Sequence, residues 1–270
     1  MKYLLAALLL LGLALLSGGV LVRRGSARAN SSPQSERVPV IVELFTSEGC
    51  SSCPPAEALL KKLEQQQPLA SSEVIALEEH VDYWNNLGWA DPFSSSEFTS
   101  RQQQYSVTLG TQGSYTPQMI VDGRAEFVGS RSSLAQREIA NASRTPKMGI
   151  AVAAKKPGDA HSEEFAVRVG KLPGASSGDA AEVWLAITES NLHSAVTAGE
   201  NSGEDLQHAS VVRRLQKIGE AKDSGESSFS GDVTAKVESN WKRENVRVVI
   251  FVQEKKSRRI LAAATAGITG

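Results

Sequence analysis

The 270-residue sequence has only two cysteines, few aromatic residues (6%) and almost no net charge, with 29 basic against 30 acidic side chains. This balance excludes the strongly basic face that a nucleic-acid backbone requires. Glycine (22 residues) and proline (10 residues) are too scarce for a collagen-like chain. Two cysteines cannot build the disulfide framework of a small secreted domain. The sequence is therefore that of an ordinary globular protein, long enough for two domains.

The first 29 residues have the organisation of an export signal. A leucine-rich run over residues 3–22 precedes Ala27-Arg28-Ala29, which has the small-x-small form that signal peptidase cleaves. We predict cleavage after Ala29, a periplasmic or secreted product, and no stable membrane insertion afterwards. The alternative is an uncleaved membrane anchor, because the run approaches the roughly 20 residues that span a bilayer. Residues 30–36 are polar and predict a disordered leader.

The two cysteines, Cys50 and Cys53, are separated by two serines. Residues 38–45 form an apolar, β-branched run that is typical of a buried strand, and residues 46–49 form a polar turn. Two prolines follow Cys53, and proline suits the first turn of a helix. The pattern therefore predicts a strand, a turn, a Cys-x-x-Cys motif and a helix, in that order.

This arrangement favours thiol–disulfide exchange. A cysteine at a helix N-terminus is stabilised as the thiolate, which is the attacking species in disulfide exchange. We expect Cys50 to attack and Cys53, one turn deeper, to resolve the mixed disulfide, with this redox-active pair as the only cofactor. Glu43, in the preceding strand, is a candidate buried proton acceptor for Cys53; a solvated carboxylate is its alternative. Glu48 is expected to be a solvated turn residue.

Two other interpretations of the motif stay open. Cys50 and Cys53 with His80 are candidate ligands for a soft ion such as Cu(I), as in a metallochaperone. Alternatively, the disulfide is purely structural and the protein is a non-catalytic binding protein.

The rest of the first half continues this pattern. Strands are expected over residues 73–81, 118–121 and 125–128, with a hairpin turn at Asp122-Gly123 between the last two. Helices are expected to begin near Ser94 and Leu134.

Many short segments resemble one known family. They are His80–Trp89, Asp91–Phe93, Arg101-Gln102, Tyr115–Met119, Gly199–Asn201, Leu206, His208 and Val211–Arg213. The sequence resembles, over about residues 38–265, a secreted bacterial family catalogued as domain of unknown function 1223. The resemblance implies export, a thioredoxin-like fold and a redox pair. It also implies that Pro117 is a cis proline lying against the Cys-x-x-Cys motif, with Thr116 pairing with the substrate chain.

Four aromatic residues are candidates for the wall of a substrate groove: Tyr83, Trp84, Trp89 and Tyr115. Aromatic side chains carry the largest apolar areas, so packing in the core of a helical insert is the alternative.

From Lys147 onward, apolar residues alternate with polar ones in several short segments. Such spacing is typical of an antiparallel sandwich. The predicted fold is therefore an α/β thioredoxin-like domain with a helical insert over residues 37–145, followed by an all-β, sandwich-like domain over residues 146–270. The acidic loop 200–205 is expected to be a solvated surface turn rather than a calcium site.

The leading prediction is an exported thiol–disulfide oxidoreductase. Its expected partners are protein thiols or small thiols, with a membrane-bound electron donor as a further candidate and no nucleic acid.

Overall fold

The computed structural model describes residues 37–155, 161–171, 179–222 and 227–268. The predicted signal and leader, residues 1–36, lie outside the described residues. Within the described ranges, no helix is both long enough and apolar enough to cross a membrane.

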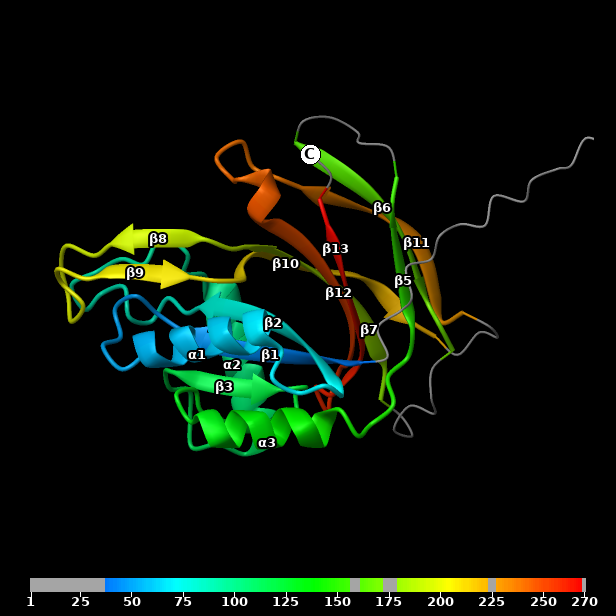
Figure 1. Cartoon of the computed structure of the whole chain (residues 1–270), viewed down its shortest axis with the longest axis horizontal. Coiled ribbons are helices and arrows are strands. Elements are labelled where there is room, and N and C mark those ends of the chain that lie inside the picture. Colours follow the sequence, from blue (N-terminus) through cyan, green and yellow to red (C-terminus); the bar gives the residue numbers. More distant parts are fainter. Residues whose placement is uncertain (1–36, 156–160, 172–178, 223–226, 269–270) are drawn as a thin grey trace, which may run out of the picture. The chain divides into compact units, whose positions relative to one another are not determined.

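The first half of the described chain alternates strands and helices (Figure 1). Its elements are β1 (Val38–Thr46), α1 (Pro54–Gln66), β2 (Ser72–His80), α2 (Ser96–Leu109), β3 (Gln118–Val121), β4 (Ala125–Val128) and α3 (Ser132–Ala142). Strand β1 pairs in parallel with β2 and antiparallel with β3, which pairs with β4. Helix α1 begins at its two prolines, and α2 begins after Ser95, whose hydroxyl accepts a hydrogen bond from the amide of Glu97.

The second half of the described chain is almost entirely strand. Its elements are β5 (Ile150–Ala154), β6 (Ser162–Val169), β7 (Ala181–Glu189), β8 (Leu192–Ala195), β9 (Asp205–His208), β10 (Val211–Ala221), β11 (Phe229–Lys236), the 3-10 helix η1 (Arg243–Asn245), β12 (Val246–Glu254) and β13 (Ile260–Gly267).

One mixed sheet contains strands from both halves, in the order β13-β12-β7-β10-β2-β1-β3-β4. The junction is at the start of β10, where Val211 pairs in parallel with Glu78 of β2 and the Glu78 amide donates to the carbonyl of Ser210 at 2.9 Å. The described residues accordingly belong to one compact unit, Ser35–Gly270.

The predicted fold class, an α/β thioredoxin-like domain followed by a separate all-β domain, is therefore wrong. The described chain is mostly β, with only three α-helices, and its largest sheet is a mixed eight-stranded one. The physical reason is that alternation of apolar and polar residues identifies a strand but not its partner. The pairing of β10 with β2 joins residues that are far apart in the sequence.

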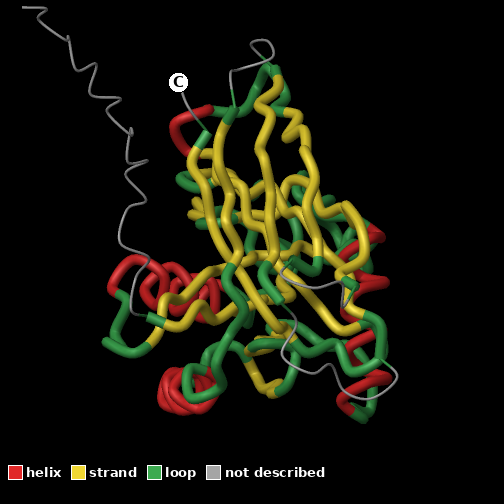
Figure 2. Tube along the Cα trace, turned by 90° about the vertical axis from the view of Figure 1, so that its right-hand side faces the viewer, coloured by secondary structure: helices red, strands yellow, loops and turns green. Residues whose placement is uncertain are grey.

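A second, three-stranded sheet has the order β11-β6-β5. It packs on the large sheet through a core to which Phe165 and Val167 contribute from β6, and Val183, Leu185 and Ile250 from β7 and β12. This two-layered region occupies the upper part of Figure 2, where the described residues form strands and loops but no long helix. The second half thus fits a sandwich only loosely, because one of its two layers continues into the first half.

The two faces of β1 pack against different helices. Val42 and Leu44 belong to the core formed with α1 and α3, whereas Phe45 packs with Tyr105 of α2. Because successive side chains of a strand point to opposite faces, Glu43 shares the α2 face with Phe45.

Strands β8 and β9 form a separate two-stranded sheet, which we call the arm together with its loop (residues 192–208). The arm leaves the large sheet between β7 and β10 and lies beside α1 (Figure 1). It brings a segment of the second half to the start of α1, where the two cysteines are.

Candidate functional site

Cys50 and Cys53 form a disulfide in the turn that begins α1, which confirms the predicted pair. Their Cα atoms are 5.4 Å apart, and Cys53 is the N-cap residue of the helix. The amide of Cys53 donates to the carbonyl of Cys50, and the hydroxyl of Ser52 lies 3.3 Å from Sγ of Cys50. Both cysteines are fully buried. The sulfurs are thus at a helix start, as predicted, but closed off from solvent.

The Thr116–Pro117 peptide bond is cis, as the family resemblance implied. The space beside Gly129 is bordered by Ala56 of α1 and by the ring of Pro117, so this proline lies against the beginning of α1. The hydroxyl of Thr116 accepts a hydrogen bond from the indole of Trp84 at 2.9 Å. The structure therefore brings Thr116, Pro117 and Trp84 to the same end of α1.

The four predicted groove aromatics divide into two pairs. Trp84 packs beside Gly49, and the indole of Trp89 donates to Glu48 at 2.7 Å, so both tryptophans contact the turn before Cys50. The hydroxyl of Tyr83 donates to Gln102, and that of Tyr115 donates to Glu126. The tyrosine hydroxyls are thus held by residues outside the Cys-x-x-Cys turn.

Glu43 does not reach the disulfide. Its carboxylate accepts from Nε of Arg101 at 2.6 Å and from the hydroxyl of Tyr105 at 2.5 Å, on the α2 face of the sheet. The predicted role as proton acceptor for Cys53 therefore has no geometric support, because the strand directs residue 43 away from α1.

Glu57 is the buried acidic residue in the first turn of α1, and its amide donates to the carbonyl of Cys53 at 3.2 Å. Residues four apart on a helix are neighbours, which places Glu57 beside Cys53 in the first turn of α1. Its carboxyl accepts a hydrogen bond from the hydroxyl of Thr46 at 2.5 Å. Burial, together with the charge of Glu78, raises the pKa of Glu57 to about 7 against the opposing effects of His208 and His80.

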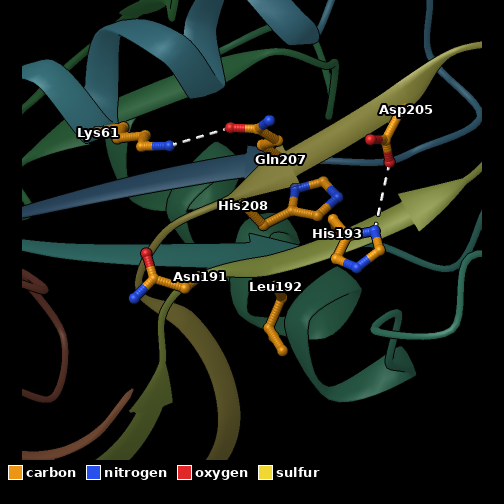
Figure 3. Close-up of a pocket in the computed structure, with 7 residues that line it drawn as sticks. All are labelled: Lys61, Asn191, Leu192, His193, Asp205, Gln207 and His208. Atoms are coloured by element: carbon orange, nitrogen blue, oxygen red, sulfur yellow. Dashed lines mark hydrogen bonds and ion pairs between the residues drawn. The ribbon is translucent and has the colours of Figure 1, made fainter. Parts of the chain in front are cut away.

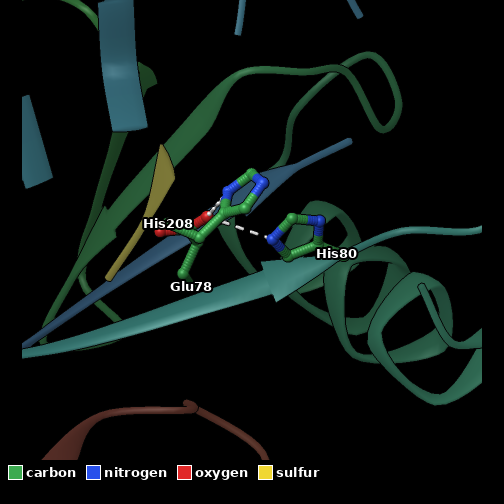
Figure 4. Close-up of side chains that lie close together, drawn as sticks. All are labelled: Glu78, His80 and His208. Atoms are coloured by element: carbon green, nitrogen blue, oxygen red, sulfur yellow. Dashed lines mark hydrogen bonds and ion pairs between the residues drawn. The ribbon is translucent and has the colours of Figure 1, made fainter. Parts of the chain in front are cut away.

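Two histidines meet a single carboxylate oxygen beneath the Cys-x-x-Cys turn. Nε2 of His80 is 3.0 Å, and Nδ1 of His208 is 2.7 Å, from Oε1 of Glu78 (Figure 4). Glu78 and His80 come from β2, whereas His208 ends the arm strand β9. All three side chains are fully buried. We call Glu78, His80 and His208 the histidine cluster.

The other ring nitrogen of each histidine also contacts a carboxylate. Nδ1 of His80 is 2.7 Å from Asp91, and Nε2 of His208 is 3.1 Å from Glu48. Glu48 is fully buried. The prediction of a solvated turn residue is therefore wrong for Glu48. The predicted grouping of His80 with the two cysteines as metal ligands is not assembled, because the ring nitrogens of His80 face Glu78 and Asp91 and the metal-ligating groups gathered around it in the described residues are Glu78 and His208.

These contacts shift the pKa values within the cluster. Burial lowers the pKa of His208, but hydrogen bonds to Glu48 and Glu78 outweigh it and raise that pKa to about 9. The pKa of His80 lies well above its ordinary value because the charge of Asp91 outweighs the effect of burial. Burial raises the pKa of Glu78, but hydrogen bonds from both histidines bring it down to about 2. The ionised carboxylate of Glu78 is thus strongly stabilised.

The loop of the arm covers the disulfide turn. Oε2 of Glu200 accepts hydrogen bonds from the amide and the hydroxyl of Ser51, at 3.0 and 2.7 Å. The side-chain amide of Asn201 donates to the carbonyls of Glu48 and Cys50, at 2.8 and 3.1 Å. Although Glu200 itself is exposed, the loop expected to be a simple surface turn is therefore part of the site.

A cavity of about 250 Å³ opens beside the histidine cluster, between the arm and α1 (Figure 3). Seven residues line it: Lys61, Asn191, Leu192, His193, Asp205, Gln207 and His208. His193 and Asp205 form an exposed pair at 3.3 Å on the arm. His208 is thus the member of the cluster that borders this cavity.

The family model described as "Protein of unknown function (DUF1223)" matches residues 41–253. The chain belongs to this family. The crystal structure of a protein from Agrobacterium tumefaciens is similar to this DUF1223 chain, with a TM-score of 0.64 and 28% identity over 88% of this chain and 100% of that one. HBP35 of Porphyromonas gingivalis shares the fold, with a TM-score of 0.63 and 16% identity over 87% of this chain and 76% of that one. No curated protein matches the sequence.

Several residues of this DUF1223 site were not predicted as functional. Glu57 could have been found from its position four residues after Cys53, and Glu78 from its position two residues before His80 on one strand face. Asn201 and His208 lie in segments that resemble the family, but the sequence gave them no role in the site, because only the path of the arm brings them to the start of α1.

Proposed function

We propose that this protein is an exported thiol–disulfide oxidoreductase, in which Cys50 and Cys53 exchange their disulfide with a protein thiol or a small thiol. The observation that carries the proposal is the position of the disulfide at the start of α1, with Cys53 as the N-cap. The first amides of a helix have no intrahelical acceptors, and the positive end of the helix dipole stabilises a thiolate there.

The exchange has two balanced steps. A substrate thiolate attacks Sγ of Cys50, the Cys50–Cys53 bond breaks as the new S–S bond forms, and Cys53 leaves as a thiolate that takes up a proton. A second substrate thiolate then attacks the substrate sulfur of this mixed disulfide and releases Cys50 as a thiolate. The substrate pair loses two electrons and the cysteine pair gains them; the reverse sequence reduces a substrate disulfide.

Access to the disulfide requires movement of the arm. Both sulfurs are buried, and Glu200 and Asn201 hold the arm loop over the turn. Withdrawal of this loop would leave Cys50 beside Trp84 and Thr116, which are joined by a hydrogen bond. These two residues, with Pro117, are the candidate wall against which a substrate chain would lie.

Export is consistent with this chemistry, since disulfides persist in oxidising compartments outside the cytosol. The proposed signal over residues 1–29, cleaved after Ala29, would place the protein in the periplasm or the medium.

The proposal is tested by disulfide exchange between the purified protein and a reduced peptide or glutathione. We expect catalysis by the unaltered protein and none by Cys50→Ser. When a peptide disulfide is the substrate, Cys50 of the Cys53→Ser variant should attack it, release one peptide thiol and accumulate as a mixed disulfide, since the resolving thiol is then missing. Mass spectrometry identifies the adduct, and a redox titration of the pair against glutathione gives the direction of electron flow.

Equal exchange rates in both single variants and in the unaltered protein would contradict the proposal. In that case the disulfide would be structural, and the double serine variant would lower the melting temperature without affecting any exchange.

A further inference from the structure

The histidine cluster has the donor atoms of a metal centre. Glu78 and His80 are two residues apart on β2 and so share one face of the strand, and His208 approaches that face from the arm. One nitrogen of each imidazole and one oxygen of Glu78 lie within 4.8 Å of one another. Donors at about 2 Å from a tetrahedral zinc ion are about 3.3 Å apart. The two imidazole contacts to Glu78, at 3.0 and 2.7 Å, would therefore widen by a few tenths of an ångström to admit the ion.

The surroundings of the two imidazoles favour ligation. Metal-bound histidines almost always direct their second ring nitrogen to a carboxylate, a carbonyl or water, which fixes the ring and raises its basicity. Here Asp91 occupies that position for His80, and Glu48 occupies it for His208. The ring of Phe93 packs against both imidazoles, with centroid distances of 5.5 Å.

A fourth carboxyl group completes the set. Oε2 of Glu57 lies 3.8 Å from Nδ1 of His208, which is the nitrogen that faces Glu78. Four carboxyl groups (Glu48, Glu57, Glu78 and Asp91) are therefore buried around two imidazoles. A divalent cation ligated by the two neutral imidazoles would take the place of the protons that the imidazoles release on binding, so the buried carboxylates would keep a positive partner.

We propose that this protein binds one divalent transition-metal ion of the zinc type through Glu78, His80 and His208, with Glu57 as the nearest further donor. Two imidazoles and one or two carboxylates suit zinc, and the cysteines take no part in this site. The ion would also brace the turn before Cys50, because Glu48 belongs to that turn and contacts His208.

The test begins with isothermal titration of the metal-stripped, oxidised protein with Zn²⁺. We expect one ion per chain and a higher melting temperature when the metal is present. Substitution by Co²⁺ should give the absorption of a tetrahedral nitrogen and oxygen site, without a thiolate charge-transfer band. The double variant Cys50→Ser, Cys53→Ser should bind equally well.

Two further variants separate this site from its neighbour on the arm. Asp91→Asn neutralises the carboxylate behind His80, which also accepts from the amides of Glu48 and Phe93, and should weaken Zn²⁺ binding by about 10- to 100-fold. His193→Gln removes the exposed histidine of the His193–Asp205 pair and should bind Zn²⁺ as the unaltered protein does.

Three results would overturn the proposal. One is failure of the unaltered protein to bind Zn²⁺, which would mean that the two imidazoles are protonated and only form ion pairs with the carboxylates around them. The second is loss of binding in His193→Gln, which would place the ion on the exposed pair. The third is a thiolate band in the Co²⁺ spectrum, which would place it on the cysteines.

Discussion

Glu78 and Glu79 are neighbours in β2, yet their side chains enter two different buried charge clusters. Glu78 meets His80 and His208 on the side of the disulfide, whereas Glu79 lies 3.4 Å from Nε of Arg101. Successive residues of a strand point to opposite faces, so β2 separates the two clusters. The comparison shows how one strand supports two kinds of buried charge.

The arginine cluster joins elements that are already fixed. Arg101 of α2 binds Glu43 of β1 and donates to Gln253 of β12 at 3.1 Å, and Gln253 donates to Tyr105 at 2.7 Å. Burial raises the pKa of Glu79 well above its ordinary value, with the charge of Arg101 acting against it. These contacts tie three strands and a helix together in one core.

The histidine cluster differs in both chemistry and attachment. Arginine stays charged and has no lone pair to offer a metal, whereas imidazole can lose its proton and become a ligand. One histidine comes from the arm, whose strands pair only with each other within the described ranges. The first cluster is therefore expected to act as a structural tie, and the second to respond to ions and to movement of the arm.

The largest expected effect is on stability, from Arg101→Met. Loss of the guanidinium removes the cation that faces the buried acids Glu43 and Glu79 and leaves Glu43 with only the hydroxyl of Tyr105, so we expect the free energy of unfolding to fall by about 3–5 kcal/mol. Urea denaturation measures this change. A matched variant, Arg137→Met, removes an exposed ion pair with Glu138 and should change stability by less than about 1 kcal/mol.

The cause is checked by neutralising the two acids as well. Arg101→Met combined with Glu43→Gln and Glu79→Gln should recover much of the lost stability, since no unpaired charge then remains. If the triple variant is no more stable than Arg101→Met alone, packing of the arginine stem rather than charge explains the loss.

Sequence patterns predicted those features of the fold and of the site that depend on residues close together in the sequence. The disulfide, its place at the start of α1, and the hairpin around Asp122-Gly123 follow from local spacing and turn chemistry. The strand face of Glu43 was also predictable, because Glu43 lies between Val42 and Leu44, which point to the opposite face. The predicted role of Glu43 as proton acceptor for Cys53 did not take this alternation into account.

The remaining features depend on long-range pairing, which local patterns do not encode. The continuous sheet rests on the contact of Val211 with Glu78, and the histidine cluster rests on the arm carrying His208 to β2. His80 and His208 each look like an isolated histidine in the sequence. The sequence places Glu78 on the same strand face as His80, but the contact of Glu78 with His208 becomes visible only once β9 and β2 are placed together.

A smaller effect is expected where the arm meets the disulfide. Glu200→Ala removes the contact with Ser51, so the loop should open more often and dithiothreitol should reduce the disulfide about two- to fivefold faster, the size expected for an exposed charged contact. Stopped-flow measurement of thiol release gives the rate, and the melting temperature should not change.

The matched control is Glu204→Ala, which removes an exposed carboxylate from the same loop. It should leave the reduction rate as it is. An equal increase in both variants would mean that net charge on the loop, rather than the contact with Ser51, governs access to the sulfurs.

The smallest effect is a dependence of this access on pH. Hydrogen bonds from the hydroxyl and the amide of Ser51 hold the pKa of Glu200 below its ordinary value of 4.5. A lowered pKa means that the contact is fully present above 4.5 and is lost as the pH falls through the lowered value. The rate at which a phosphine reduces the unaltered protein should therefore approach the rate for Glu200→Ala as the pH falls, because at each pH the comparison cancels the protonation of the phosphine itself. The arginine cluster provides the internal reference, because opening of the arm alone should leave the fluorescence of Trp184, which packs beside Arg101, unchanged over the same range.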